Sequence, residues 1–189
     1  MWELILGLVL FLGMHSISIF AEGFRDRMAA RSELGWKAFY GLVSLLGLVL
    51  MVRGYGAARL DPVVVYVPPV FLKHLAVLAL VPIFVLFLAP YFPGRIQAAM
   101  KHPQLVSVKL WAVAHLLANG TLADLLLFGS FLGWAVADRI SMKRRGQRVI
   151  PTAPRTGFND ILLLAAGIGL YLAFLLWLHG MLFGVTPLG

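Results

Sequence analysis

Five histidines and no cysteine set the chemistry that this chain of 189 residues can perform. An imidazole ring can ligate a metal or carry a proton near neutral pH. The lack of cysteine excludes disulfides, cysteine-ligated zinc, iron–sulfur clusters and thiolate nucleophiles. The chemistry open to the histidines therefore depends on the structural elements that position them. The five are His15, His74, His102, His115 and His179.

The composition places these elements in a membrane. Hydrophobic residues make up 61% of the chain and charged residues only 13%, whereas soluble domains are about half apolar and about a quarter charged. We therefore expect an integral membrane protein whose main partner is the lipid bilayer. The net charge of +8 fits basic loops beside anionic lipid. No basic run is interleaved with aromatic residues, which argues against nucleic-acid binding.

Six segments match or approach the roughly 20 apolar residues that a spanning helix needs. The sequence predicts an all-α polytopic membrane protein, one domain over residues 1–189, with a bundle of about six transmembrane helices: 2–21, 37–55, 70–92, 104–118, 121–140 and 160–184. The first segment lacks a basic leader and is longer than a signal-peptide core, so we expect it to be retained.

Single residues refine these predicted helices. Pro82 should kink the third helix. Gly120 should end the fourth in a left-handed cap, and Thr121 with Asp124 has the form of a capping box. Small residues permit close helix approach, and the chain offers several: Gly7, Gly13, Gly41, Gly47 and Gly129.

Lysine and arginine counts predict the orientation. The loops after the first, third and fifth helices hold twelve of these residues, including Arg148, and the opposite side holds three: Arg53, Arg59 and Lys73. Positive charge favours the cytoplasmic side. Both termini should therefore face the periplasm or exterior.

This orientation pairs His15 with His115 by depth. At about 1.5 Å per residue, both lie roughly 10–15 Å below the cytoplasmic surface, while His74 and His179 fall toward the other side. Two neutral imidazoles on facing helices could hold a haem iron between them. The alternative is structural: each ring would bond a backbone carbonyl or a serine on a neighbouring helix.

Other residues would support a haem at this position. Asn119, like Ser16 and Ser18, could orient a ring N–H. Haem propionates need cations, for which Lys109, Lys101 and Arg25 are the candidates. Lys109 could equally extend to the lipid headgroups.

Several stretches resemble the NnrU family, small bacterial membrane proteins associated with denitrification. They are "GMHS" (13–16), "RLDPVV" (59–64), "HPQ" (102–104) and "KLWAVAHLLANGTLADLLLFGSFLGWAV" (109–136). The resemblance covers nearly the whole chain and implies a bacterial inner-membrane location. The family is also similar to zeta-carotene isomerase, which carries haem b between two membrane histidines. The matching positions are His15 and His115.

The resemblance implies a role for His102, and at one position, Ala112, this chain departs from the isomerase pattern. His102 would act as a loop cap or contact a propionate, because a His–Pro step favours a turn before a helix. The isomerase pattern has a cysteine three residues before its second histidine, where this chain has Ala112. Ligand exchange to a thiolate therefore cannot operate here.

Three functions remain open at this point. The first is a haem b protein with a redox or sensing role in nitrite or nitric oxide reduction, with an electron partner. The second is a haem-dependent cis–trans isomerase of a carotenoid-like polyene that enters from the bilayer. The third is a cofactor-free scaffold or assembly factor.

Overall fold

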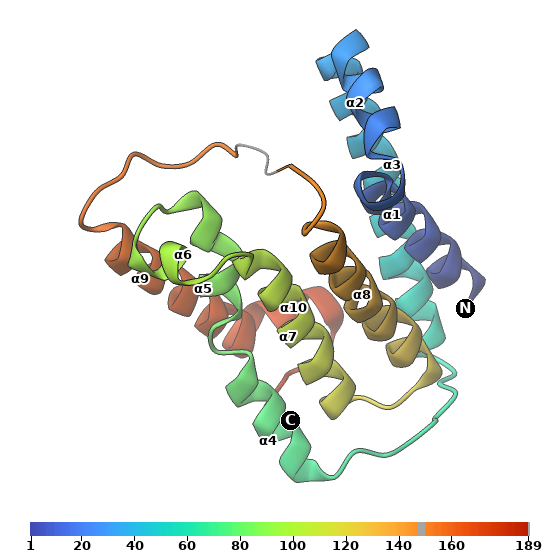
Figure 1. Cartoon of the computed structure of the whole chain (residues 1–189). Coiled ribbons are helices and arrows are strands. Elements are labelled where there is room, and N and C mark those ends of the chain that lie inside the picture. The colour runs from blue at the N-terminus through green and yellow to red at the C-terminus, as the bar shows by residue number, and fades with distance from the viewer. Residues whose placement is uncertain (147–149, 189) are drawn as a thin grey trace. The chain divides into compact units, whose positions relative to one another are not determined.

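A computed structural model describes residues 1–146 and 150–188 and shows a helical chain (Figure 1). Within these ranges strand pairing is limited to one isolated bridge, between Val64 and Thr121. The predicted all-α fold class is confirmed. Arg148, which the orientation argument counted, lies outside the described residues.

Ten α-helices are seen within the described ranges. They are α1 (Trp2–Phe20), α2 (Glu22–Arg31), α3 (Glu33–Ala58), α4 (Val70–Ala79), α5 (Ile83–Leu88), α6 (Arg95–Ala99), α7 (Pro103–Ala118), α8 (Leu122–Ser141), α9 (Asn159–Ala173) and α10 (His179–Phe183). A 3₁₀ turn, η1 (Ala89–Tyr91), follows α5, and a π-helical turn, η2 (Phe174–Leu178), joins α9 to α10.

Four segments are long and apolar enough to cross a membrane: Trp2–Phe20, Glu33–Ala58, Val70–Tyr91 and Asn159–Phe183. The predicted count of six is not confirmed. Helix α7 has only 16 residues, fewer than the roughly 20 that span a bilayer. Helix α8 has 20 residues but carries charged residues near both ends.

The helices form two compact units. Unit 1 comprises residues 1–66 and 121–145, and unit 2 comprises 67–120 and 146–189. Each unit is described separately below.

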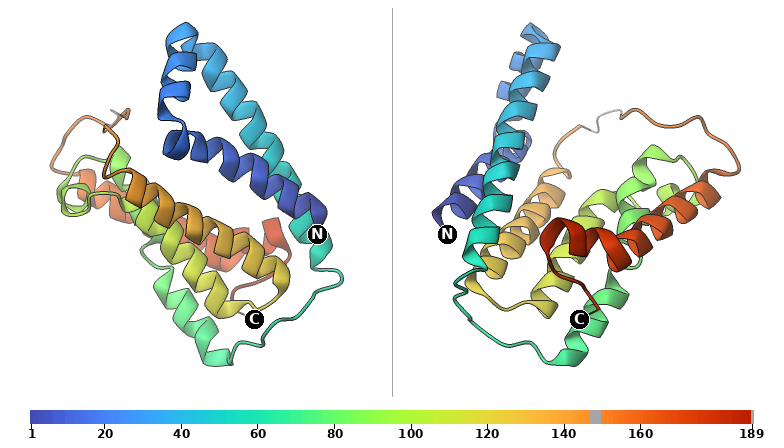
Figure 2. Two further views of the ribbon diagram at one scale, coloured as in Figure 1. Left: turned by 45° about the vertical axis from the view of Figure 1, so that its right-hand side comes forward. Right: turned by 180° about the vertical axis from the view of Figure 1, so that it is seen from behind.

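In unit 1, α1 crosses and packs against α3 (Figure 2), and glycines lie where the two backbones meet. A Cβ added to Gly47 would lie 2.7 Å from the backbone nitrogen of Phe11, and one added to Gly7 would lie 2.7 Å from the carbonyl oxygen of Gly47. Such contacts require glycine, because they bring two backbones together. Gly13, Gly41 and Gly129, also predicted for close approach, have nothing within 4 Å of the added atom.

The amino end of α8 is hydrogen-bonded to α3 within unit 1. The predicted capping box is confirmed: Asp124 N–H donates to the Thr121 hydroxyl, and Thr121 N–H donates to the Asp124 carboxylate at 2.8 Å. The Tyr55 hydroxyl of α3 donates to the same carboxylate at 2.5 Å. Asp124 is buried, and these hydrogen bonds satisfy it there.

In unit 2, α5 contacts both α7 and α9 (Figure 1). Pro82 separates α4 from α5, a larger break than the predicted kink, because proline cannot donate to the helical ladder. The Ser107 hydroxyl of α7 donates to the Ile83 carbonyl at 2.9 Å. Gly120 does not adopt the predicted left-handed conformation; among the described residues only Gly184 has a positive φ. Helix α7 ends instead at an extended Asn119.

Candidate functional site

His15 of α1 sits among aromatic side chains of unit 1. Its ring stacks on Phe11 at a centroid distance of 4.2 Å, with Tyr40 of α3 at 5.2 Å and Trp134 of α8 edge-on at 5.9 Å. Its Nδ1 lies 2.7 Å from the Phe11 carbonyl oxygen. A carbonyl only accepts, so Nδ1 carries the hydrogen and donates, which puts the ring's lone pair on Nε2.

Buried donors accompany this ring in unit 1. Among the described residues, three buried side-chain atoms lack a hydrogen-bond partner: Ser44 Oγ, Trp134 Nε1 and Arg145 Nε. An unsatisfied buried donor costs about 1–3 kcal/mol. A water or a ligand oxygen would stabilise each of these atoms.

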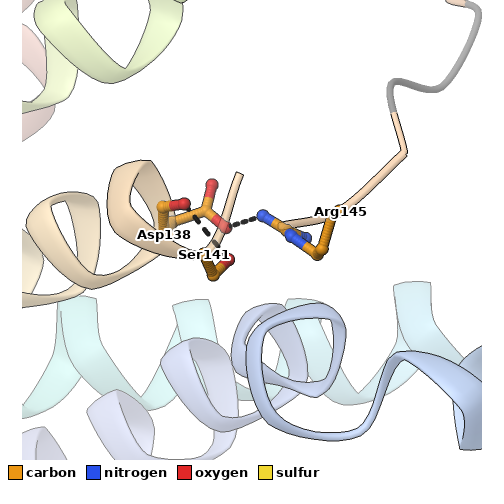
Figure 3. A network of polar contacts seen from close by, with 3 residues as sticks. All are labelled: Asp138, Ser141 and Arg145. Carbon is orange, nitrogen blue, oxygen red and sulfur yellow. Dashed lines mark hydrogen bonds and ion pairs between the residues drawn. The ribbon is translucent and has the colours of Figure 1, made fainter. Parts of the chain in front are cut away.

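A buried ion pair holds one of these donors in place (Figure 3). Arg145 Nη2 donates to the Asp138 carboxylate, and the side chains are only 12% and 10% exposed. Asp138 lies one helical turn beyond Trp134 on the same face of α8. The Ser141 hydroxyl donates to the Asp138 backbone carbonyl at 3.2 Å. The carboxylate thus orients a guanidinium that keeps a further N–H for a ligand.

His115 of α7 repeats the local geometry of His15 in unit 2. Its Nδ1 lies 2.8 Å from the carbonyl oxygen of Trp111, one turn earlier, and the two rings have centroids 5.2 Å apart. Phe11 and His15 have the same spacing in α1. Each of these carbonyls belongs to the histidine's own helix, so the structural alternative, with partners on a neighbouring helix, stays a prediction. The lone pair on each Nε2 still leaves both rings suited to ligate a metal.

The predicted pairing of His15 with His115 stays a prediction, because His15 belongs to unit 1 and His115 to unit 2. Within unit 2, His115 has a different neighbour. The His179 ring lies at a centroid distance of 6.4 Å and an interplanar angle of 24°. The depth estimates placed these two rings in opposite halves of the bilayer. Their approach was not expected, because α7 ends only three residues after His115 and a π-helical turn precedes His179.

Three other predicted cofactor residues lie on α7 or at its ends: His102, Lys109 and Asn119. His102 occupies the N-cap position and Pro103 begins the helix, as the His–Pro step predicted, but the imidazole makes no capping hydrogen bond. Asn119 donates from its amide to the backbone carbonyl of His115 at 2.9 Å, while the His115 ring is oriented by Trp111. Lys109 is half-buried on the same helix.

The sequence did not identify the polar residues near the carboxyl end of α8 as part of a site. Asp138 and Trp134 share a helical face at a four-residue spacing, a signal that could have linked them. Arg145 carried no such signal, because it stood among several basic residues of a loop. Its burial comes from the turn after α8.

Each histidine, taken within its own unit, has the chemistry of a haem iron ligand. The described residues contain no group of three or more His, Cys, Asp or Glu side chains arranged for a bare metal ion, but a porphyrin supplies four iron ligands and leaves only axial positions to the protein. His15 and His115 each offer an Nε2 lone pair beside aromatic rings. The buried donors of unit 1, Arg145 Nε among them, suit carboxylates such as propionates.

The fold and composition define a polytopic helical membrane protein with histidines on its apolar helices. The family model described as NnrU protein matches residues 3–187, so the chain belongs to the NnrU family. No curated protein and no solved structure matches it significantly.

Proposed function

We propose that this protein binds haem b through His15 and His115 and has a redox or sensing role linked to denitrification. The observation that carries the proposal is the shared geometry of the two rings. In each, Nδ1 bonds the carbonyl of the aromatic residue one turn earlier, at 2.7 Å for His15 and 2.8 Å for His115. Metal-ligating histidines commonly donate their other N–H in this way, which fixes the tautomer and raises the basicity of the ligand.

The surrounding residues would hold the group and shield it. The aromatic rings of Phe11 and Trp134 offer flat apolar surfaces beside His15. Arg145 Nε and Trp134 Nε1 would donate to propionate oxygens, which removes the cost of leaving them buried without partners. The haem iron would supply one-electron redox chemistry, and two imidazole ligands favour electron transfer over the binding of an external ligand.

A visible spectrum of the protein purified in detergent tests this proposal. We expect a Soret band and the spectrum of a six-coordinate low-spin iron. His15→Ala and His115→Ala should each abolish or alter it. His74→Ala removes an exposed imidazole from α4 and should leave it unchanged. A protein that shows no Soret band after haem supplementation, or wild-type spectra for both ligand variants, refutes the assignment and favours the scaffold.

The link to denitrification comes from the resemblance to the family and has its own test. In the source organism, His15→Ala and His115→Ala should lower nitrite or nitric oxide reductase activity in whole cells, and His74→Ala should not. Unchanged reductase activity in both ligand variants would contradict this role. The isomerase alternative predicts conversion of supplied cis-zeta-carotene in cells that lack the pathway enzyme.

A further inference from the structure

The rings of His115 and His179 lie close together with nearly parallel planes, at a centroid distance that leaves room for one metal ion. Their centroids are 6.4 Å apart and their planes differ by 24°. This distance is at the wide end of the range for aromatic pairs, about 4.5–7 Å. Metal–nitrogen bonds of about 2.0–2.1 Å on each side, together with the ring radii, put two imidazoles on opposite sides of a metal roughly 6 Å apart. The observed spacing therefore accommodates a metal between the rings.

The local structure around His179 holds its ring in a defined position. The π-helical turn η2 ends at Leu178 and α10 begins at His179, so the turn sets the face on which this ring lies. Single π-helical turns occur frequently at functional sites. The Phe183 ring contacts His179 edge-on at a centroid distance of 5.0 Å.

Gly184 shapes the turn that brings a backbone carbonyl to the His179 ring. Its φ of +68° is a left-handed conformation that costs other residues roughly 1–2 kcal/mol. The chain turns there, after α10 (Figure 2), and the next residue, Val185, presents its carbonyl to His179 Nδ1 at 2.6 Å. The glycine is therefore needed to bring that carbonyl to the ring.

Both rings of the pair are consequently in the same tautomer. The Nδ1 of His115 donates to the Trp111 carbonyl and that of His179 to the Val185 carbonyl. In each ring the hydrogen is on Nδ1 and the lone pair on Nε2, the form in which imidazole binds a metal.

We propose that His115 and His179 form a two-imidazole ligand pair, through Nε2, for a transition-metal centre. The metal is either the iron of a haem or a free ion of a metal that imidazole favours, such as Cu²⁺ or Zn²⁺. The haem case rests on the proposed function: His179 would serve as the second ligand beside His115 when His15 does not hold that position. The free-ion case is independent of it.

The haem arm of the test uses purified full-length protein titrated with haem. We expect His15→Ala to retain a six-coordinate low-spin iron, with altered electron paramagnetic resonance g-values, because His179 serves as the second ligand. The double variant His15→Ala/His179→Ala should be five-coordinate and high-spin. A high-spin iron in His15→Ala alone overturns the pair for haem.

The free-ion arm titrates haem-free protein with Cu²⁺ and, separately, Zn²⁺. If the pair binds a free ion, one equivalent binds per chain, and His115→Ala and His179→Phe each abolish this binding while His15→Ala and His74→Ala retain it. The phenylalanine keeps most of the ring volume, so loss of binding there reports loss of the nitrogen. If no Soret band forms but the ion binds in this pattern, the proposed function fails and the pair stands. Failure in both arms overturns the pair.

Gly184→Ala gives a variant with both imidazoles intact. It disfavours the left-handed turn and should displace the Val185 carbonyl from His179 Nδ1. Loss of a group that orients a metal-ligating histidine typically lowers metal affinity about 10–100-fold, and we expect that weakening for whichever metal binds. Gly180→Ala is the matched control, because its added Cβ meets only a side-chain methyl, at 3.4 Å. Equal affinities for the two variants would contradict the role of Val185.

Discussion

Gly47→Ala should disturb both the packing of unit 1 and the support of His15. The added Cβ would lie 2.7 Å from the Phe11 nitrogen and 3.0 Å from the Gly7 carbonyl oxygen, whereas ordinary contact begins at 3.4 Å. The backbones of α1 and α3 would have to separate locally by about 0.7 Å, which as overpacking costs about 1–3 kcal/mol. The Phe11 carbonyl accepts the hydrogen bond from His15, so the same movement reaches the ring.

Gly41→Ala is the control for this substitution. Gly41 lies on the same helix, and its added Cβ meets nothing within 4 Å. Both variants gain about 1 kcal/mol of helix propensity, so the difference between them isolates the steric conflict. We expect Gly47→Ala to have a free energy of unfolding about 1–3 kcal/mol below that of Gly41→Ala.

The assay is unfolding of the two variants in the same detergent, by steric trapping or thermal denaturation. A haem titration of both proteins reports on His15: Gly47→Ala should bind haem more weakly or with a shifted Soret band, and Gly41→Ala should match the wild type. Equal unfolding free energies for the two variants would refute the close contact of α1 with α3. A weakened fold with wild-type haem binding would refute its connection to His15.

Two further predictions concern packing and charge. Gly167→Ala should destabilise unit 2, because its Cβ would lie 2.7 Å from the Val85 nitrogen. Gly169→Ala is the control, since its Cβ meets nothing within 4 Å. Equal melting temperatures for the two variants would contradict this contact. Arg145→Ala leaves Asp138 buried without its partner and should lower the free energy of unfolding by about 3–5 kcal/mol. The double variant with Asp138→Asn should recover most of this loss in the same detergent unfolding assay, and no recovery would show that the ion pair is not its cause.

Most features that depend on short segments were predicted correctly from the sequence, but the left-handed cap at Gly120 was not. The apolar composition indicated a helical membrane protein, because a bilayer requires every backbone polar group to be paired within its own segment. The Thr121–Asp124 cap was predicted because its partners are three residues apart. Pro82 was expected to disturb its helix because a proline in a helix interior has no amide hydrogen to donate.

Features that depend on which surfaces meet were predicted less well. Five glycines were equally suited to close approach, but only Gly7 and Gly47 among them are in close contact with a second helix, because the crossing point of α1 and α3 depends on every side chain between them. The predicted count of six spans was not confirmed, since α7 has only 16 residues and α8 carries charged residues near both ends.

The histidines show the same difference between what the sequence predicts and what packing decides. The sequence alone determined that imidazoles lie on apolar helices without any cysteine, and the resemblance selected His15 and His115. Only the tertiary structure brought His179 to His115 and gave it a carbonyl partner, through a π-helical turn and a left-handed glycine. The physical reason is that residue type and spacing fix local hydrogen bonding and the preference for lipid, whereas the approach of residues 64 positions apart depends on how whole helices bend and pack.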